Sequence, residues 1–211
     1  MAKRSPPSRT SVRRKLIALG RRFYGRDWVL GTSGNFSVVL SRKPMRLLLT
    51  ASAVHKGRLR SSDFLEVAEG GKTTARGRKP SAETALHLAI ARTRGAGAVL
   101  HTHSVWSTIL SAQHAAAGGL TIHGYEMLKG LGGVSTHEHH ERIPIVENDQ
   151  DMTRLAGVVT DLLMRTPDAH AFLLAGHGLY TWGATLADAE RHVEILEFLF
   201  ETVARRSQPW P

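Results

Sequence analysis

The chain has 211 residues, a length that suits one globular domain, and it contains no cysteine. The lack of cysteine excludes disulfide scaffolds, zinc ribbons, iron–sulfur clusters and thiolate nucleophiles. Apolar residues make up 42% of the chain and charged residues 22%, which is ordinary globular usage and excludes wholesale disorder. Any borderline metal ion would therefore be bound by the 12 histidines together with carboxylates.

The net charge of +10 is concentrated at the N-terminus. Residues 1–26 hold nine lysines and arginines and no acidic residue, so the remainder carries 19 basic and 18 acidic residues. A nearly neutral body argues against specific nucleic-acid binding, and we interpret the basic stretch as solvated. We predict a disordered basic arm over residues 1–9 and a single domain over residues 10–211.

The sequence favours a cytoplasmic protein without a membrane partner. Its N-terminus lacks the apolar core of a secretory signal. Residues 95–125 have no Lys, Arg, Asp or Glu, but they contain four histidines and several glycines. A bilayer span would not tolerate that composition cheaply.

Helical and strand patterns alternate along the whole chain, which predicts one layered α/β domain. Val12, Leu16, Leu19 and Phe23 recur at helical spacing in a first helix that starts at Thr10. The further predicted helices cover residues 81–94 (with Ser81 as cap), 104–112, 125–129, 149–165 and 186–205. The predicted strands cover residues 35–40, 45–50, 64–68, 73–75, 98–102, 120–123, 142–146, 171–174 and 179–182.

Two histidines at the end of an apolar strand give the strongest chemical signal. His101 and His103 are two residues apart, so their side chains project from one face of the strand and can share a metal ion. His177 lies between Gly176 and Gly178, which allow a close backbone approach. As a third ligand, His177 would complete the three-histidine set with one open position that is typical of catalytic zinc.

Two glutamates are candidates for acid–base work near such a metal. Glu83 lies in the first turn of a predicted helix, where the macrodipole favours an acidic residue without any function. Glu126 follows a predicted strand shortly after the two histidines. Spacing alone assigns a role to neither carboxylate.

A loop of small and polar residues, GTSGNFS over residues 31–37, could present backbone amides to a phosphate. It lacks the lysine of a P-loop and the glycine spacing of a dinucleotide-binding turn. The candidate substrate- and phosphate-binding residues are Thr32, Ser33, Gly34, Asn35, Ser52, Lys56 and Ser81.

The remaining histidines carry no clear pattern. The segment THEHHE over residues 136–141 is interpreted as solvated, or as an adventitious metal binder. Five other histidines are interpreted as structural, namely His55, His87, His114, His170 and His192.

Taken in order, GTSGNFS, KPSAETALH, HTHS, HGYEMLKG and AGHGLYTWG resemble the class II aldolase/adducin family from about Leu16 to the C-terminus. The resemblance implies a three-layer α/β/α sandwich with a mixed, mostly antiparallel sheet. It also implies a homo-oligomer, commonly a tetramer, with active sites near subunit interfaces. One departure stands out, because the family usually has T-P-S-G where this chain has Thr50-Ala51-Ser52-Ala53.

The same resemblance implies roles for the candidate residues. His101, His103 and His177 would bind one zinc ion per subunit, and Glu126 would be the catalytic acid and base, with a pKa raised by partial burial. Glu83 would serve the metal or the proton transfer. Segments such as IPIVENDQDM and LLAGHGLYTWG resemble a dehydratase branch, whose members remove water from a 2-keto sugar phosphate.

Three alternatives stay open at this point. The same zinc site would serve a class II sugar-phosphate aldolase or a pentulose-phosphate 4-epimerase. A non-catalytic, adducin-like interaction domain needs no metal, although retention of three histidines and two glutamates argues against it. A nucleic-acid binder would depend on the basic arm alone.

Overall fold

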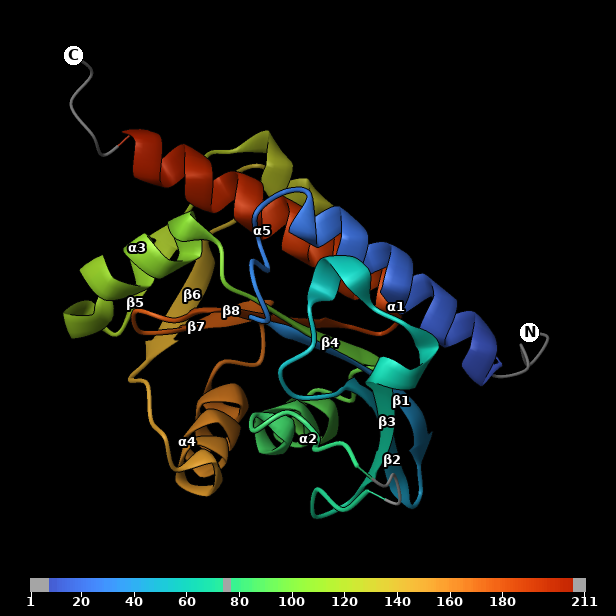
Figure 1. Ribbon diagram of the computed structural model, residues 1–211. Helices are drawn as coiled ribbons and strands as arrows, with labels where there is room; N and C mark the ends of the chain where they lie inside the picture. Colours follow the sequence, from blue (N-terminus) through green and yellow to red (C-terminus); the bar gives the residue numbers. More distant parts are fainter. Residues whose placement is uncertain (1–7, 74–76, 207–211) are drawn as a thin grey trace, which may run out of the picture.

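The computed structural model describes residues 8–73 and 77–206, which fold around one eight-stranded sheet (Figure 1). The strand order is β3-β2-β1-β4-β8-β7-β6-β5. Every neighbouring pair is antiparallel except β6 and β7, which are parallel. The strands are β1 (Asn35–Arg42), β2 (Met45–Thr50), β3 (Phe64–Ala68), β4 (Ala98–Thr102), β5 (Gly119–Ile122), β6 (Glu141–Val146), β7 (Ala171–Leu174) and β8 (Gly178–Gly183).

Helices cover both faces of this sheet. One face carries α1, α3 and α5, and the other carries α2 and α4 (Figure 1). The predicted three-layer α/β/α sandwich with a mostly antiparallel sheet is therefore confirmed. The helices are α1 (Arg9–Tyr24), α2 (Thr84–Thr93), α3 (Val105–Gln113), α4 (Met152–Arg165) and α5 (Leu186–Arg206), with short 3-10 turns η1 (Lys56–Arg58), η2 (Ser61–Asp63), η3 (Ala115–Ala117) and η4 (Glu126–Gly130).

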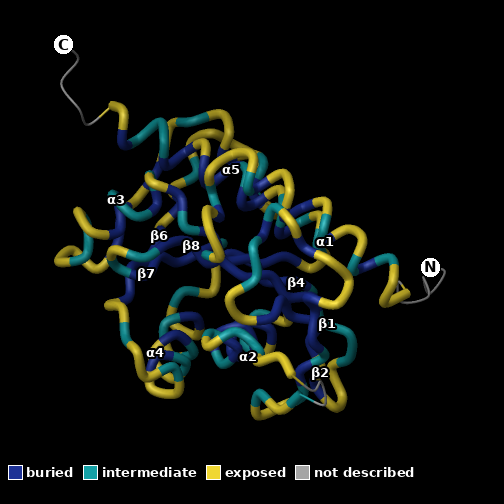
Figure 2. Tube along the Cα trace, in the orientation of Figure 1, coloured by how far each residue is buried: buried dark blue, intermediate teal, exposed yellow. Residues whose placement is uncertain are grey.

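Strand β4 is buried along its whole length at the centre of the sheet, as Figure 2 shows. Its side chains alternate between the two faces. Ala98 and Leu100 pack with α1 and α5, whereas Val99 packs with α2 and α4. His101 therefore points to the α2 and α4 face, as the two-residue period of a strand requires.

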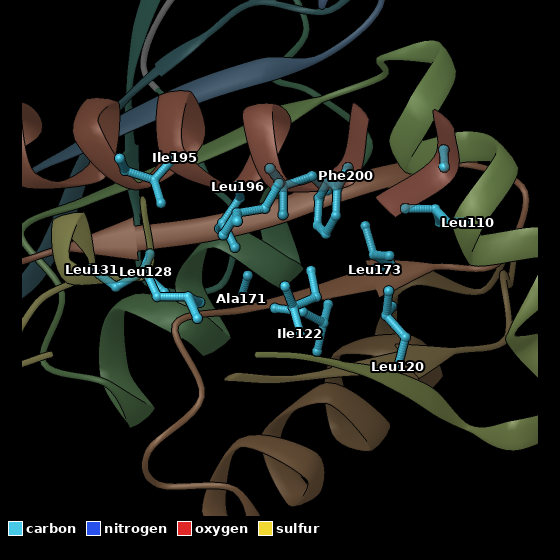
Figure 3. Packing of buried hydrophobic residues seen from close by; sticks show 14 of the residues in the cluster. Leu110, Leu120, Ile122, Leu128, Leu131, Ala171, Leu173, Ile195, Leu196 and Phe200 are labelled. Carbon is cyan, nitrogen blue, oxygen red and sulfur yellow. The ribbon is translucent and has the colours of Figure 1, made fainter. Parts of the chain in front are cut away.

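Another apolar cluster fills the layer between helices α3 and α5 and the half of the sheet that contains β5 to β8 (Figure 3). Leu196 and Phe200 from α5 pack there on Leu173 of β7 and Ile122 of β5. Because these side chains are nearly or fully inaccessible to solvent, apolar burial stabilises the half of the sheet that contains β5 to β8.

The first helix has the buried stripe that its sequence predicts, with Val12, Leu16, Leu19 and Phe23 all buried. It begins at Arg9, where the hydroxyl of Ser8 accepts a hydrogen bond from the Ser11 amide. The predicted disordered arm over residues 1–9 lies largely outside the described residues, and the domain boundary at residue 10 stays a prediction.

The helices predicted over residues 81–94 and 125–129 differ from the structure, and the strand predicted over residues 73–75 lies mostly outside the described residues. The helix expected over residues 81–94 begins at Thr84, because residues 81–83 form a turn in which the Ser81 hydroxyl accepts from the Glu83 amide. The helix expected over residues 125–129 is the 3-10 turn η4, a segment too short to nucleate a stable α-helix. Only Thr73 of the strand expected over residues 73–75 is described, and it forms an isolated bridge with Val67.

Among residues 8–73 and 77–206, no helix combines the length and apolarity that crossing a bilayer requires.

Candidate metal centre

Three imidazole nitrogens face one another at the end of β4. The Nε2 atom of His103 lies 2.7 Å from Nε2 of His101, and Nε2 of His177 lies 3.3 Å from His101 and 3.1 Å from His103. Two of these residues come from β4 and the segment after it, and His177 comes from the turn before β8. The structure thus brings together the three histidines that the sequence singles out.

The hydrogen bonds at the outer edge of the cluster fix which nitrogen each ring presents. Nδ1 of His101 donates to the Leu179 carbonyl at 2.8 Å, and Nδ1 of His177 lies 3.3 Å from Oδ1 of Asn148. Carbonyl oxygens only accept, so each of these rings turns an Nε2 lone pair toward the centre. This outer contact is the arrangement that orients histidine ligands in metal sites.

Burial keeps the three rings neutral. It lowers the pKa of His101 well below its ordinary value, helped by the neighbouring His177, and it lowers the pKa of His103 and His177 as well. The Nε2 lone pairs of His101 and His177 converge on the Nε2 atom of His103, an arrangement that favours a cation between the three rings. Nitrogen ligands of tetrahedral zinc lie about 3.3 Å apart, so the donor set and its spacing fit a zinc ion.

Glycines and an aromatic ring set the positions of these histidines. A Cβ on Gly178 would lie 2.1 Å from the Thr102 carbonyl oxygen, so only glycine allows β8 to approach β4 there. Tyr180 is paired with His101 across the two strands, and the two rings stack at a centroid distance of 3.9 Å. Burial and the charge of Glu83 raise the pKa of Tyr180 well above its ordinary value, so its hydroxyl stays protonated.

Glu83 adds a carboxylate to the cluster from the start of α2. Its Oε1 atom lies 3.5 Å from Nε2 of His101 and 3.4 Å from Nε2 of His177. The side chain is 13% exposed, so one edge of the carboxylate reaches solvent. From this position Glu83 can act as a fourth ligand or as a proton acceptor.

A buried chain of hydrogen bonds holds Glu83 from behind. Oε2 of Glu83 accepts from the amide nitrogen of Asn35, and Oδ1 of Asn35 faces Nε2 of His87. Because a carboxylate only accepts, the Asn35 amide must present its oxygen to His87, which then donates from Nε2. Nδ1 of His87 accepts in turn from the Ser37 hydroxyl at 2.7 Å, and burial lowers the pKa of His87 to about 4. Each donor in this series of hydrogen bonds, from Ser37 through His87 to Asn35, thus points toward Glu83.

A second buried carboxyl supports the segment that carries the histidines. Glu197 of α5 accepts a hydrogen bond of 2.7 Å from the hydroxyl of Thr102, the residue between His101 and His103. Burial raises the pKa of Glu197 to about 7, against the hydrogen bonds of Ser104 and Thr102. Helix α5 therefore holds this segment from the face opposite to Glu83.

The predicted phosphate-binding loop lies beside β4, and a lysine links it by hydrogen bonds to a second turn, which contains Val54. Nζ of Lys56 donates to the carbonyls of Thr32 at 2.7 Å and Val54 at 2.8 Å, and the residue is only 1% exposed. Burial lowers the pKa of Lys56 to about 8, although the charge of Glu83 opposes that change. A Cβ on Gly34 would lie 2.6 Å from the His101 carbonyl oxygen, so this loop and the metal ligands are in close contact.

The remaining predicted phosphate residues are placed differently from one another. The Ser33 hydroxyl is buried and makes no hydrogen bond to any described residue. Ser52 is exposed in the second turn, and its amide bonds to the Lys79 carbonyl at 2.9 Å. The Ser81 hydroxyl accepts from the Glu83 amide, and the side chain of Asn35 is committed to Glu83 and His87.

Glu126 lies on η4 and is highly exposed. Its carboxylate accepts from Lys129 at 2.6 Å and lies 3.8 Å from Nδ1 of His137, and neither contact leads to the three histidines. The expectation of a raised pKa is wrong for this conformation. A hydrogen bond from Lys129 lowers the pKa of Glu126. Because the side chain is 72% exposed, burial does little to raise that pKa.

The comparison with known proteins gives the family. The Class II Aldolase and Adducin N-terminal domain matches residues 14–204 of this chain. The chain belongs to this family. It is 47% identical over 192 residues to the methylthioribulose-1-phosphate dehydratase of Methylococcus capsulatus, a match that covers 90% of this chain and 92% of that protein. It is 46% identical to the dehydratase of Pseudomonas paraeruginosa and 45% identical to that of Azotobacter vinelandii, each over 92% of this chain and 94% of the relative.

Solved structures of other class II aldolase proteins have the same fold. YgbL of Escherichia coli superposes with a TM-score of 0.78 at 28% identity, over 96% of this chain and 93% of that chain. The L-fuculose-1-phosphate aldolase of Thermus thermophilus superposes with a TM-score of 0.75 at 24% identity, over 94% and 96% of the two chains. At that identity the likeness concerns the fold alone.

Sequence reasoning missed several residues around this class II aldolase-type site. His87 was interpreted as structural, yet it orients the amide that holds Glu83. Its spacing of four residues from Glu83 along one helix face was the available signal. Tyr180 and Glu197 carried no such signal, because an aromatic residue in a strand and an acidic residue in an amphipathic helix are ordinary.

The segment over residues 136–141 is interpreted as solvated or as an adventitious metal binder, and Thr136, His137, Glu138 and His140 are exposed accordingly. Glu141 is the exception. Glu141 is only 1% exposed, and its carboxylate contacts His139 and His170. Glu141 is the first residue of β6, which lies beside the start of β7. Its side chain is therefore covered by the loop that precedes β6.

The departure from the family's T-P-S-G pattern leads to a stability prediction. Ala53 has φ of 56°, the left-handed conformation that glycine adopts without strain. We expect Ala53→Gly to raise the free energy of unfolding by about 1 kcal/mol, measured by denaturant unfolding. The matched control is Ala18→Gly in the exposed face of α1, which should lower it by about 1 kcal/mol. Destabilisation by both changes would contradict the assignment of strain to Ala53.

Proposed function

We propose that this chain is a zinc-dependent hydro-lyase that dehydrates 5-methylthioribulose 1-phosphate to 5-methylthio-2,3-diketopentyl 1-phosphate in methionine salvage. The observation that carries the proposal is the identity of 45–47% over nine tenths of the chain to relatives named for this dehydration. The convergence of His101, His103 and His177 beside Glu83 supports it, because the donor set suits a Lewis-acidic metal.

The proposed cofactor is one zinc ion per subunit, bound by the three Nε2 atoms. When bound, zinc would supply polarisation of the substrate carbonyl and so acidify the neighbouring C–H bond. Three imidazoles also accept other first-row divalent ions, so metal quantification belongs to the test of the proposal.

Two carboxylates divide the remaining work. Glu126 removes the proton from C3 of the substrate and returns it to the C4 hydroxyl, which leaves as water. The resulting enol becomes the 2,3-diketone, and the balance of the reaction is the loss of one water molecule. Glu83, held by Asn35 beside the three histidines, would serve the metal or the proton transfer.

The phosphate of the substrate would be bound by the loop over residues 31–35 and the turn at Ser52. The Ser33 hydroxyl offers an unused donor there, and the ammonium of Lys56 supplies positive charge between the two segments. The phosphate does no chemistry, but its binding energy holds the carbon skeleton in register with the metal.

The proposed assembly is a homo-oligomer, a tetramer by resemblance, in the cytoplasm. An exposed Glu126 that makes no described contact with its own histidine cluster needs another way to reach a substrate. In an oligomer with active sites near subunit interfaces, Glu126 of one subunit serves the histidine cluster of its neighbour. The interface would then supply the burial that raises the pKa of a catalytic carboxyl.

Three other functions compete with this proposal. A class II aldolase would cleave the C3–C4 bond into two fragments, and a 4-epimerase would return an isomer, with the same metal in both cases. An adducin-like interaction domain would bind partners and turn over nothing.

The test is product analysis on purified, metal-quantified protein given methylthioribulose 1-phosphate. We expect a product that is lighter than the substrate by one water molecule. Its formation should stop when the metal is chelated and resume when zinc is added. Two fragments or an epimer would move the protein to a sister activity with the same site. The absence of turnover in a zinc-loaded sample would contradict the proposed substrate.

A further inference from the structure

A second cluster of ligating side chains lies at the opposite end of β7 from His177. It consists of His139 in the loop before β6, Glu141 at the first position of β6, and His170 just before β7. One ligand atom from each lies within 4.8 Å of the other two. The cluster shares no residue with the three-histidine centre.

Glu141 is the centre of this cluster and is almost inaccessible to solvent, with 1% of its side chain exposed. Its Oε1 atom accepts from the backbone amide of His170 at 3.0 Å. Its Oε2 atom lies 2.8 Å from Nε2 of His139 and 2.9 Å from Nδ1 of His170. Two imidazole nitrogens therefore face a single carboxylate oxygen.

The outer contact of His170 decides what its inner nitrogen can do. Nε2 of His170 lies 2.8 Å from the carbonyl oxygen of Gly132, so Nε2 carries a hydrogen. In the neutral ring, Nδ1 is then a lone pair aimed at Oε2 of Glu141, which is itself an acceptor. Two acceptors at this distance need a positive charge between them, either a proton or a metal ion.

We propose that His139, Glu141 and His170 bind a second divalent transition-metal ion, of the class of zinc. Two imidazoles and one carboxylate are a common donor set for zinc, and the separations of 2.8 and 2.9 Å match those within the three-histidine centre. The carbonyl that fixes His170 plays the part that the Leu179 carbonyl plays for His101. His139 is 28% exposed, which leaves a route for the ion and room for water as a further ligand.

Such a site would be structural and would fasten a loop. The segment before β6 has few apolar anchors of its own, and the ion would join it to the start of β7. The same segment carries His137, whose carbonyl accepts from the Gly124 amide at 3.1 Å and whose ring lies near Glu126. Fastening the loop would therefore also restrain the surroundings of η4.

The test is metal stoichiometry on the full-length protein after loading with zinc and removal of the excess. We expect two equivalents per chain for the unaltered protein and one for His139→Ala, whose side chain is partly exposed. His140→Ala is the matched control, because this neighbour stacks on His123 outside the cluster and should leave two equivalents. One equivalent in the unaltered protein, unchanged by His139→Ala, would overturn the proposal and assign a proton to His170.

A second variant separates this site from the catalytic proposal. His101→Ala should retain one equivalent of zinc, and added zinc should still raise its thermal unfolding midpoint by mass action. Addition of His139→Ala to that variant should remove both effects. If His101→Ala binds no zinc at all, the second site is refuted while the three-histidine centre stands.

Discussion

An equal mixture of Glu126→Gln and His101→Ala subunits should be active, although each variant alone is not. Glu126→Gln removes the proton acceptor and should lower turnover by about a hundred-fold or more while zinc stays bound. His101→Ala removes a metal ligand that is fully buried between two strands and should abolish turnover and zinc binding at the three-histidine centre. When one subunit's glutamate serves another's histidines, random assembly restores about a quarter of the sites.

The measurement is turnover per subunit of co-expressed, doubly tagged oligomers, with zinc quantified in each preparation. Glu138→Gln is the matched control, since Glu138 is exposed on the neighbouring loop and should keep full activity. No recovery in the mixed oligomer would show that Glu126 does not act across an interface. Full activity of Glu126→Gln alone would remove the residue from the mechanism.

The second large effect is expected at Asn35, whose side chain is linked to the three-histidine centre only through Glu83. Asn35→Leu keeps the volume of a buried side chain but removes the donor to Glu83 and the acceptor for His87. Loss of such an outer contact typically costs about ten- to a hundred-fold in metal affinity or activity, and we expect a loss of that size here.

Metal affinity, measured by competition with a chelator, separates this positioning role from general damage. Ser37→Ala is the matched control, because it breaks the same chain of hydrogen bonds at the end remote from Glu83. It should lower the free energy of unfolding yet leave zinc affinity nearly unchanged. Equal losses of affinity in both variants would mean that the chain merely stabilises the fold.

The layered fold follows from local patterns that the sequence displays openly. The apolar stripe of α1 and the continuous burial of β4 were both predictable, because each depends on a period that one segment contains. The start of α2 was not, since Ser81 caps a turn before the helix instead of the helix itself. Whether a hydroxyl serves a helix or a preceding turn depends on tertiary contacts that no local pattern encodes.

The residues of the candidate site also fall into those that the sequence predicts and those that it does not. His101 and His103 were predictable as a pair from the period of a strand, and His177 from its glycines. The contacts of Asn35 with Glu83 and with His87 join β1 to α2, and no spacing in the sequence reports such a meeting. The exposure of Glu126 was likewise invisible, because burial depends on neighbours in space and, in this proposal, on another subunit.

The strand order has a consequence for how the chain could be divided. Strands β1 to β4 form one half of the sheet and β5 to β8 the other, and the two halves pair only where β4 meets β8. His101 and His103 belong to the first half and His177 to the second, so a bound metal ion is shared by the two halves of the polypeptide. Two fragments cut at the exposed turn around Gly118 should reassociate more tightly with zinc than without it, which would make the enzyme a metal-controlled split protein.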